Sequence, residues 1–218
     1  MLKLFMTKIK TDTKTKICES AKKLFNEQET LSITTNHIAK EAGISPGNLY
    51  YHFKNKEEII LLLYQNLSTQ FESLNTFEGI ILNKNPIQAL HKIFEYYAEM
   101  FFEYRFLLRD SMVLIALYPS FKEAFTKNQD KRITQIEGLL QFFIQENILN
   151  FPLEQNLKRR AKLHWFITSY WQVFASSSSE VSKESIEEAK EIFFDFMIYP
   201  FLTHKGKMML EGIDNKLA

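Results

Sequence analysis

The chain has 218 residues, of which 45% are hydrophobic, and its formal net charge at pH 7 is +1. This near balance of charge excludes a uniformly basic surface for nucleic acid, and a chain with only 6 glycines and 5 prolines is typical of long helices. The charge is nevertheless uneven, because residues 1–66 carry 10 lysines against 7 acidic residues. Any nucleic acid is therefore expected to meet the N-terminal segment.

Residues 1–10 form a short basic arm, which is either a frayed terminus or a contact to DNA phosphates or the minor groove. No apolar stretch follows its lysines, so no secretory signal is expected. The longest uncharged run, 163–179, is too polar to span a membrane. Cys18 is the only cysteine, which excludes an intrachain disulfide and favours a reducing, cytoplasmic location. Its place on a helix predicted over 13–27 indicates a small core residue rather than a redox sensor.

The stretch 32–56 predicts two short helices joined by a tight turn, followed by the start of a third. Thr34 is a good N-cap for the first helix, because its hydroxyl can accept from an unpaired N–H of the opening turn. Gly43 can adopt the left-handed conformation that ends this helix. Ser45 and Pro46 then supply a cap and a proline at the first helical position. The pattern predicts a helix-turn-helix.

The outward face of the second short helix carries the residue types that major-groove readout requires. Asn48 can contact a base edge, and Tyr51 offers a ring for a thymine methyl group. Lys56 lies at the start of the next helix, where charge and free N–H groups both favour a phosphate. The alternative is a small helical hairpin whose polar face meets only water, but it does not explain the cap, the glycine turn, the Ser-Pro restart and the donor-rich face together.

The run TTNHIAKEAGISPGNLYYHFKNKEEI resembles the DNA-binding domain of TetR-type (TetR/AcrR) transcriptional repressors, in which the pattern ITxxxIAxxAGxSxGxLYxHFxxKExL recurs. The resemblance implies two sets of DNA-contacting positions. The positions that face phosphates are Thr35, Ser45, Tyr50, His52 and Lys56; those that approach bases are Asn36, Pro46, Gly47, Asn48 and Tyr51. Asn36 departs from the arginine of some members, and Pro46 cannot donate a hydrogen bond, so direct readout is expected to depend on Asn48 and Tyr51.

The rest of the chain predicts six more helices, over 56–74, 86–103, 105–118, 119–149, 154–175 and 185–202. Residues 75–85 are read as a connection, 176–179 as a turn, and the tail after His204 as loosely held. The resulting fold class is all-α, with about nine helices, as the resemblance implies. Residues 1–57 are assigned to a three-helix DNA-binding domain and 58–218 to a helical ligand-binding and dimerisation domain.

Aromatic residues are concentrated in the C-terminal domain, which favours an apolar ligand cavity beside a large core. The predicted lining consists of Tyr96, Tyr97, Met100, Phe101, Arg105, Arg109, Met112 and Trp165. Arg109 and Asp110 either form an internal ion pair or turn to solvent; the functional alternative is that the arginine anchors a ligand carboxylate. The last two helices have broad apolar faces, which predict a homodimer through a four-helix interface. Its predicted residues are Phe166, Tyr170, Phe174, Ile192, Phe193, Phe196 and Met197.

Other chemistry finds little support in the sequence. His91 and Glu95 lie one helical turn apart, but two ligands do not make a metal site, so no metal or cofactor is expected. Nucleophile and phosphate-loop motifs are absent, and no catalytic residue is assigned. The sequence therefore predicts a DNA-binding regulator rather than an enzyme: a repressor that is released from its double-stranded operator by a small apolar or amphipathic ligand. The alternative is an all-α enzyme or interaction module with a structural helix-turn-helix.

Overall fold

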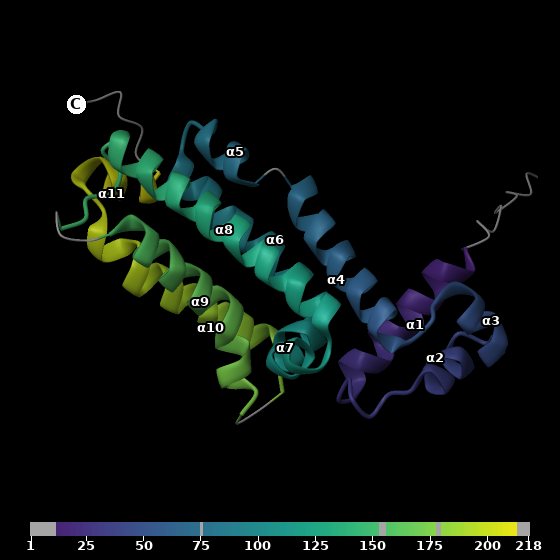
Figure 1. Cartoon of the computed structure of the whole chain (residues 1–218). Helices are drawn as coiled ribbons and strands as arrows, with labels where there is room; N and C mark the ends of the chain where they lie inside the picture. The colour runs from purple at the N-terminus through teal and green to yellow at the C-terminus, as the bar shows by residue number, and fades with distance from the viewer. Residues whose placement is uncertain (1–11, 75, 153–155, 178–179, 213–218) are drawn as a thin grey trace, which may run out of the picture. The chain divides into compact units, whose positions relative to one another are not determined.

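The computed structural model describes residues 12–74, 76–152, 156–177 and 180–212. These residues contain eleven α-helices, one 3-10 helix and a single isolated β-bridge, so the predicted all-α class is confirmed (Figure 1). The predicted basic arm, 1–10, lies outside the described residues. Internal contacts divide the chain into two compact units. Their boundary in the sequence falls between Leu63 and Tyr64, inside one helix.

The N-terminal unit contains α1 (Thr13–Glu27), α2 (Thr35–Glu41), α3 (Pro46–His52) and the first part of α4 (Lys56–Ser73). Its core is a small set of apolar side chains at helical spacing, drawn from each of these helices: Ile17, Ala21, Phe25, Ile38, Leu49, Phe53, Ile59 and Ile60. Cys18 is buried beside them, and burial raises the pKa of its thiol to about 11. A thiol with such a raised pKa is a core residue, as the sequence indicates, and not a reactive thiolate.

The C-terminal unit contains the remainder of α4 and seven further α-helices. These are α5 (Thr76–Ile81), α6 (Pro86–Glu103), α7 (Arg105–Leu117), α8 (Pro119–Gln145), α9 (Leu157–Ala175), α10 (Lys183–Met197) and α11 (His204–Leu210), with the 3-10 helix η1 (Tyr199–Phe201) between the last two. In Figure 1 the long helices α8, α9 and α10 run alongside one another, and α9 packs against both of the others. Their apolar faces share one core, which includes Leu140, Phe143, Ala161 and Phe194.

Two segments that were expected to lack structure are helical. The expected connection 75–85 contains α5, whose Thr76 and Ile80 are buried. The tail expected to be loose contains α11, which begins at a Thr203 cap. Asn85 also holds α11, because its Nδ2 donates to the carbonyl oxygen of Met209 at 2.7 Å. Both helices are short and draw their stability from packing, which local sequence does not reveal.

Two predicted helix ends are also corrected. The helix expected over 119–149 ends at Gln145, because Asn147 takes a left-handed backbone conformation with φ of 54°. The segment after it forms the β-bridge between Leu149 and Leu202. The helix expected over 185–202 begins earlier, behind a Ser182 cap, and ends at Met197. The segment after α8 also packs closely against α11. Gly206 of α11 is required there, since a Cβ at this position would collide with the carbonyl oxygen of Ile148.

Candidate nucleic-acid interface and internal cavity

The helix-turn-helix is held by the local signals that its sequence contains. Thr34 caps α2 by accepting from the backbone N–H of His37 at 3.3 Å, and the His37 ring accepts from the N–H of Thr34 in return. Gly43 has a φ of 62°, as expected for the residue that ends α2. Ser45 caps α3 by accepting from the N–H of Asn48 at 3.2 Å. The orientation of α3 is therefore fixed at its N-terminal end, where major-groove readers place their contacts.

The outward face of α3 is exposed. The side chain of Tyr51 is 84% exposed, and Gly47 and Asn48 are exposed beside it. The ring of Tyr51 meets the ring of His52 edge-on at 5.1 Å. An aromatic residue that is 84% exposed has no role in this unit's own core, so its ring and hydroxyl are accessible to a binding partner.

Tyr50 connects the two helices of the motif. Its hydroxyl lies 2.9 Å from the hydroxyl of Thr35, so one donates to the other across α2 and α3. Asn36 is exposed at the start of α2, next to this pair. Pro46 occupies the first position of α3 and has no N–H to donate. The positions assigned to DNA contact by resemblance thus include residues that also build the motif.

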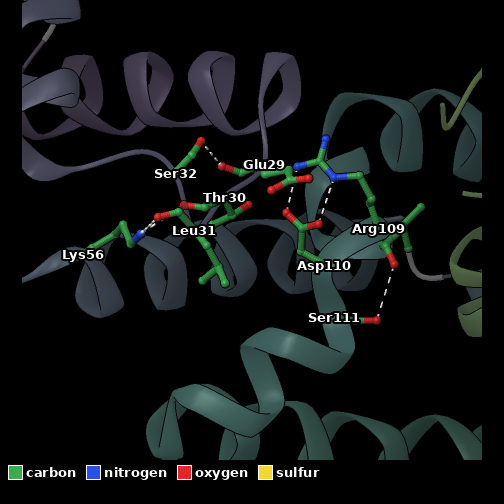
Figure 2. Close-up of polar contacts among 9 residues, drawn as sticks. Glu29, Thr30, Leu31, Ser32, Lys56, Arg109, Asp110 and Ser111 are labelled. Carbon is green, nitrogen blue, oxygen red and sulfur yellow. Dashed lines mark hydrogen bonds and ion pairs between the residues drawn. The ribbon is translucent and has the colours of Figure 1, made fainter. Parts of the chain in front are cut away.

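Lys56 makes contacts within the protein that its predicted role does not include. Its ammonium donates to the carbonyl oxygens of Thr30, Leu31 and Ile33 at 3.0, 3.3 and 2.8 Å, and Figure 2 shows the first two of these partners. Burial lowers the pKa of this ammonium. A lysine ammonium has three hydrogens, and all three are engaged here. Lys56 therefore clamps the segment between α1 and α2, and a phosphate would have to displace one of these carbonyls.

The start of α4 carries contacts that sequence reasoning missed. Asn55 accepts from the N–H of Glu58 at 3.0 Å, and Glu58 accepts from the N–H of Lys54 at 2.8 Å. Asn55 therefore caps the first turn of α4, while Glu58 holds the N–H of the residue before that cap; the signal in the sequence is the Asn-x-x-Glu spacing. The side chain of Lys54 is exposed. It is therefore a better phosphate-contact candidate than Lys56.

A cavity of about 170 Å³ lies inside the C-terminal unit. It is bounded by every helix from α4 to α10, and most of its wall is aromatic or aliphatic. From α4 the wall takes Tyr64, Leu67, Ser68 and Phe71. An internal apolar cavity with a few polar groups is the usual form of a small-molecule site.

Of the eight residues predicted to line a ligand cavity, Tyr97, Phe101 and Trp165 do so. The other five do not: Tyr96, Met100, Arg105, Arg109 and Met112. Tyr96 and Met112 point to solvent, with 52% and 53% of their surface exposed. The error arose because apolar spacing identifies a helix face but not which face meets an empty space.

The two arginines predicted to anchor a ligand have other partners. Arg109 forms a two-pronged ion pair with Asp110, with contacts of 2.8 and 2.7 Å, which Figure 2 shows. Arg105 donates to the carbonyl oxygen of Phe102 at 3.1 Å, and its guanidinium lies 4.6 Å from the Phe102 ring centre. Of the interpretations of Arg109, the ion pair is therefore the one that the structure contains.

The arginine that does line the cavity is Arg132 on α8. Its side chain is buried, and its guanidinium lies 3.8 Å from the ring centre of Phe71. It donates to Glu72 and, at 2.8 Å, to Gln135. Glu72 also pairs with the exposed Lys131 at 2.8 Å, and these two cations help to lower the pKa of the Glu72 carboxyl against the opposing effect of burial. The buried charge of Arg132 is thus already balanced by a carboxylate.

Most hydroxyls of the cavity wall are bonded within the protein. Tyr97 donates to the hydroxyl of Thr76 at 2.8 Å, and Ser111 donates to the carbonyl oxygen of Leu108 at 3.4 Å. Thr168 donates back to the carbonyl oxygen of His164 at 3.0 Å. Burial raises the pKa of the Tyr97 hydroxyl well above its usual range. These groups are neutral and satisfied, so they offer a ligand little beyond shape.

Three buried polar atoms of the wall are different. The Nε2 atom of His164, the Nε1 atom of Trp165 and the hydroxyl oxygen of Tyr64 have no hydrogen-bond partner within the described part of the chain. His164 is 3% exposed, and burial, assisted by the charge of Arg160, lowers its pKa to about 3. The imidazole is therefore neutral at physiological pH. An unsatisfied buried polar group costs about 1–3 kcal/mol, which a suitable ligand atom would recover.

Sequence reasoning named Trp165 but missed its neighbour His164. A signal was present, because Ala161, His164, Gln172 and Ala175 recur at helical spacing and form the buried stripe of α9. A histidine within such a buried stripe indicates that a polar side chain is buried in the packed structure. Gln172 is satisfied by two hydrogen bonds with Ser185 on α10, at 3.0 and 2.8 Å. His164 lacks such a partner for its Nε2 atom.

The outer faces of α9 and α10 carry exposed aromatic side chains. Phe166, Phe174 and Phe196 are 59%, 68% and 66% exposed, and Leu163 on α9 is 48% exposed. The predicted interface residues Tyr170 and Ile192 are partly buried. So large an exposed apolar set is unusual on a protein that has no partner.

Two residues predicted for the dimer interface require correction. Phe193 and Met197 are each 4% exposed and belong to the chain's own core. Phe193 packs against the rings of Phe94 and His164. The error arose because α10 is apolar on more than one side, so its spacing could not distinguish the face covered by α6 and α9 from the outer face.

The described ranges contain no group of three or more His, Cys, Asp or Glu side chains placed to hold a metal ion. Within the same ranges, no helix is both long enough and apolar enough to cross a bilayer.

A capped helix-turn-helix with an exposed outward face, joined through one helix to a larger helical unit, defines a DNA-binding regulator.

Comparison with protein families identifies the particular kind. Residues 17–63 match the model of bacterial regulatory proteins of the tetR family, and residues 68–210 match that of the bacterial transcriptional repressor TetR. The chain belongs to the TetR family of transcriptional regulators, as its resemblance implies.

Individual relatives agree with this assignment. The HTH-type transcriptional regulator HbdR of Aromatoleum is 25% identical over 94% of this chain and 88% of its own length. A regulator of Staphylococcus aureus is 40% identical over 72 residues, a match that spans only 36% of that protein. A TetR-family regulator from Marinobacter aquaeolei has the same fold, with a TM-score of 0.76, 23% identity and coverage of 93% and 97% of the two chains.

Proposed function

We propose that this regulator is a homodimeric repressor that acts in the cytoplasm and leaves its DNA operator when a small, mostly apolar molecule enters the cavity of the C-terminal unit. The observation that carries the proposal is the role of α4. Its first residue, Lys56, clamps the DNA-binding unit, while Leu67, Ser68 and Phe71 further along the same helix line the cavity. A ligand that moves these side chains acts on a helix that is continuous with the DNA-binding unit.

For DNA readout we propose that Asn48 and Tyr51 contact bases and that Gly47 allows close approach of the backbone. Thr35, Tyr50 and His52 would contact phosphates, together with the exposed Lys54. The exposure of Tyr51 and the two capped helix starts support this assignment. Lys56 would contribute by holding the motif together.

For assembly we propose a two-fold dimer through the outer faces of α9 and α10. The exposed side chains of Phe166, Phe174 and Phe196 support it, since a contiguous apolar surface of this kind is best buried against a copy of itself. The two recognition helices of such a dimer would lie about 34–36 Å apart, or a multiple of that distance, to meet successive major grooves.

The energetic demand on the ligand is considerable. Moving a population from mostly DNA-competent to mostly released requires a preference of about 5.5 kcal/mol, or roughly 10⁴-fold. Burial of apolar surface contributes about 25 cal/mol per Å², so about 200 Å² of additional contact in the released state would supply most of it. The apolar wall of the cavity makes such a contribution available.

The test is binding of the full chain to the DNA upstream of its own coding sequence, measured by gel shift with a shuffled DNA of equal composition as the control. We expect a complex with the upstream DNA at protein concentrations that leave the shuffled DNA free. Equal binding to the two DNAs would reject a sequence-specific regulator. The alternative, an enzyme or interaction module, would then become the stronger interpretation.

A further inference from the structure

The cavity of the C-terminal unit contains information about the chemistry of its occupant, and the inference below rests on the proposed effector site. A volume of about 170 Å³ holds roughly six waters at the liquid share of about 30 Å³ each. The occupant is therefore a molecule of roughly six to eight non-hydrogen atoms, most of them apolar. The polar atoms of the wall indicate the chemistry of its polar end.

The described residues that line the cavity include no uncompensated buried cation for an acid. Arg132 is the arginine of the wall, and its guanidinium is engaged by Glu72 and Gln135. Lys131 shares the Glu72 carboxylate, but its side chain is 52% exposed and screened by water. A ligand carboxylate would have to lose its hydration without gaining a charged partner, or it would have to displace Glu72 from Arg132. Both carry a high cost in free energy.

The wall does offer unused neutral hydrogen-bonding atoms. The Nε1 atom of Trp165 can only donate, and the Nε2 atom of His164 can donate or accept according to its tautomer. Both are buried without a partner in the described part of the chain, and both residues line the cavity. The His164 ring is held by its edge-on contact with Phe193, with 4.9 Å between the ring centres.

From this pattern we infer that the effector is a neutral molecule, with an apolar body and a carbonyl or hydroxyl oxygen that accepts the N–H of Trp165 and meets the Nε2 atom of His164. The inference separates neutral ketones, esters and alcohols from carboxylic acids of the same length. It also assigns Trp165 and His164 as specificity-determining residues.

The experiment titrates the purified full chain at pH 7.5 with four probes of equal carbon number that match the cavity volume: 2-hexanone, 1-hexanol, hexanoate and hexane. Calorimetry and the shift in melting temperature report binding. We expect the ketone and the alcohol to bind at least about tenfold more tightly than hexanoate, and more tightly than hexane by the several-fold factor that one net hydrogen bond contributes. Hexanoate binding as tightly as the ketone would overturn the inference.

Matched variants locate the effect. Trp165→Phe and His164→Leu should each reduce the preference for ketone over hexane about fivefold. Trp171→Phe is the control, because Trp171 also has a buried Nε1 atom without a partner but does not line the cavity. If Trp165→Phe keeps the full preference, or if Trp171→Phe loses it, the assignment of these atoms is wrong.

A reciprocal variant tests the exclusion of acids. Glu72→Gln removes the carboxylate that balances Arg132, and the Glu72 side chain is exposed enough to tolerate the change. This variant should gain hexanoate binding at least about fivefold over the parent chain, because the freed guanidinium then donates to the ligand carboxylate. An unchanged hexanoate affinity would contradict the exclusion of acids by the Arg132–Glu72 pair.

Binding to the upstream DNA is measured in parallel, which separates the two proposals. If the chain binds its DNA specifically but none of the four probes, the inferred ligand class fails while the regulator stands. If the chain binds the ketone but no DNA preferentially, the ligand class stands and the proposed function fails.

Discussion

The ammonium of Lys56, at the start of α4, lies 2.8 Å from the carbonyl oxygen of Ile33, just ahead of α2. Together with the carbonyl oxygens of Thr30 and Leu31, this contact ties α4 to the segment that leads into the helix-turn-helix. Lys56 is therefore a structural element of the N-terminal unit.

We predict that Lys56→Met destabilises the N-terminal unit by about 2 kcal/mol, because three carbonyl oxygens lose a charged donor. Chemical denaturation followed by circular dichroism measures the change. Lys54→Met is the control, since the Lys54 side chain is exposed and should contribute less than about 0.5 kcal/mol. Equal stability of the Lys56→Met variant and the parent would contradict the clamp.

The second prediction concerns DNA readout. Asn48→Ala and Tyr51→Ala should each weaken binding to the specific site by about 1–3 kcal/mol and relax its sequence preference, because they remove contacts to base edges. Lys54→Ala should weaken binding to all sequences and reduce the slope of log K against log salt by about one unit. Fluorescence anisotropy at several salt concentrations distinguishes the two effects. Parent-like affinity and preference in both alanine variants of α3 would reject α3 as the recognition helix.

The sequence predicted those features of the N-terminal unit that depend on residues close together in the sequence. The caps at Thr34 and Ser45 and the left-handed Gly43 each follow from residues within one turn, and all three are confirmed. The partners of the Lys56 ammonium were not predicted, because the three carbonyls lie 23 to 26 residues earlier in the chain. Backbone acceptors leave no signal in the side-chain pattern.

The cavity and the outer face were predicted less completely for a related reason. Periodicity identifies an apolar face, but only the packed structure shows whether that face meets a neighbour, an empty space or solvent. Phe193 and Phe196 lie three residues apart on α10, yet they are 4% and 66% exposed. The predicted aromatic lining failed at Tyr96 in the same way, since the next residue, Tyr97, is the one that lines the cavity.

The third prediction concerns assembly. The parent chain should run as a dimer in size-exclusion chromatography with light scattering, and the double variant Phe166→Glu with Phe196→Glu should run as a folded monomer. Two carboxylates buried without partners at the interface would cost several kcal/mol. Leu82→Glu is the control, because Leu82 is 76% exposed but lies outside α9 and α10. A double variant that remains dimeric would place the interface elsewhere.

The last prediction concerns pH. Burial lowers the pKa of His164 from 6.5 to about 3, so the unfolded chain binds a proton at this residue between those values and the folded chain does not. The contribution of neutral His164 to the stability of the folded chain is therefore fully present above pH 6.5, and it is lost as the pH falls toward 3. Lowering the pH from 7.5 to 5 should reduce the free energy of unfolding by about 2 kcal/mol through this residue alone.

His91 also has a pKa lowered by burial and adds to the pH dependence of the parent chain, so the contribution of His164 must be isolated with a variant. His164→Leu keeps an apolar side chain in the wall and removes the proton site. Urea denaturation of the parent and the variant at pH 7.5 and 5 gives two differences in unfolding free energy, and that of the variant should be smaller by about 2 kcal/mol. Equal differences in the two proteins would mean that the imidazole of His164 is accessible to protons in the folded chain, which would contradict its burial in the cavity wall.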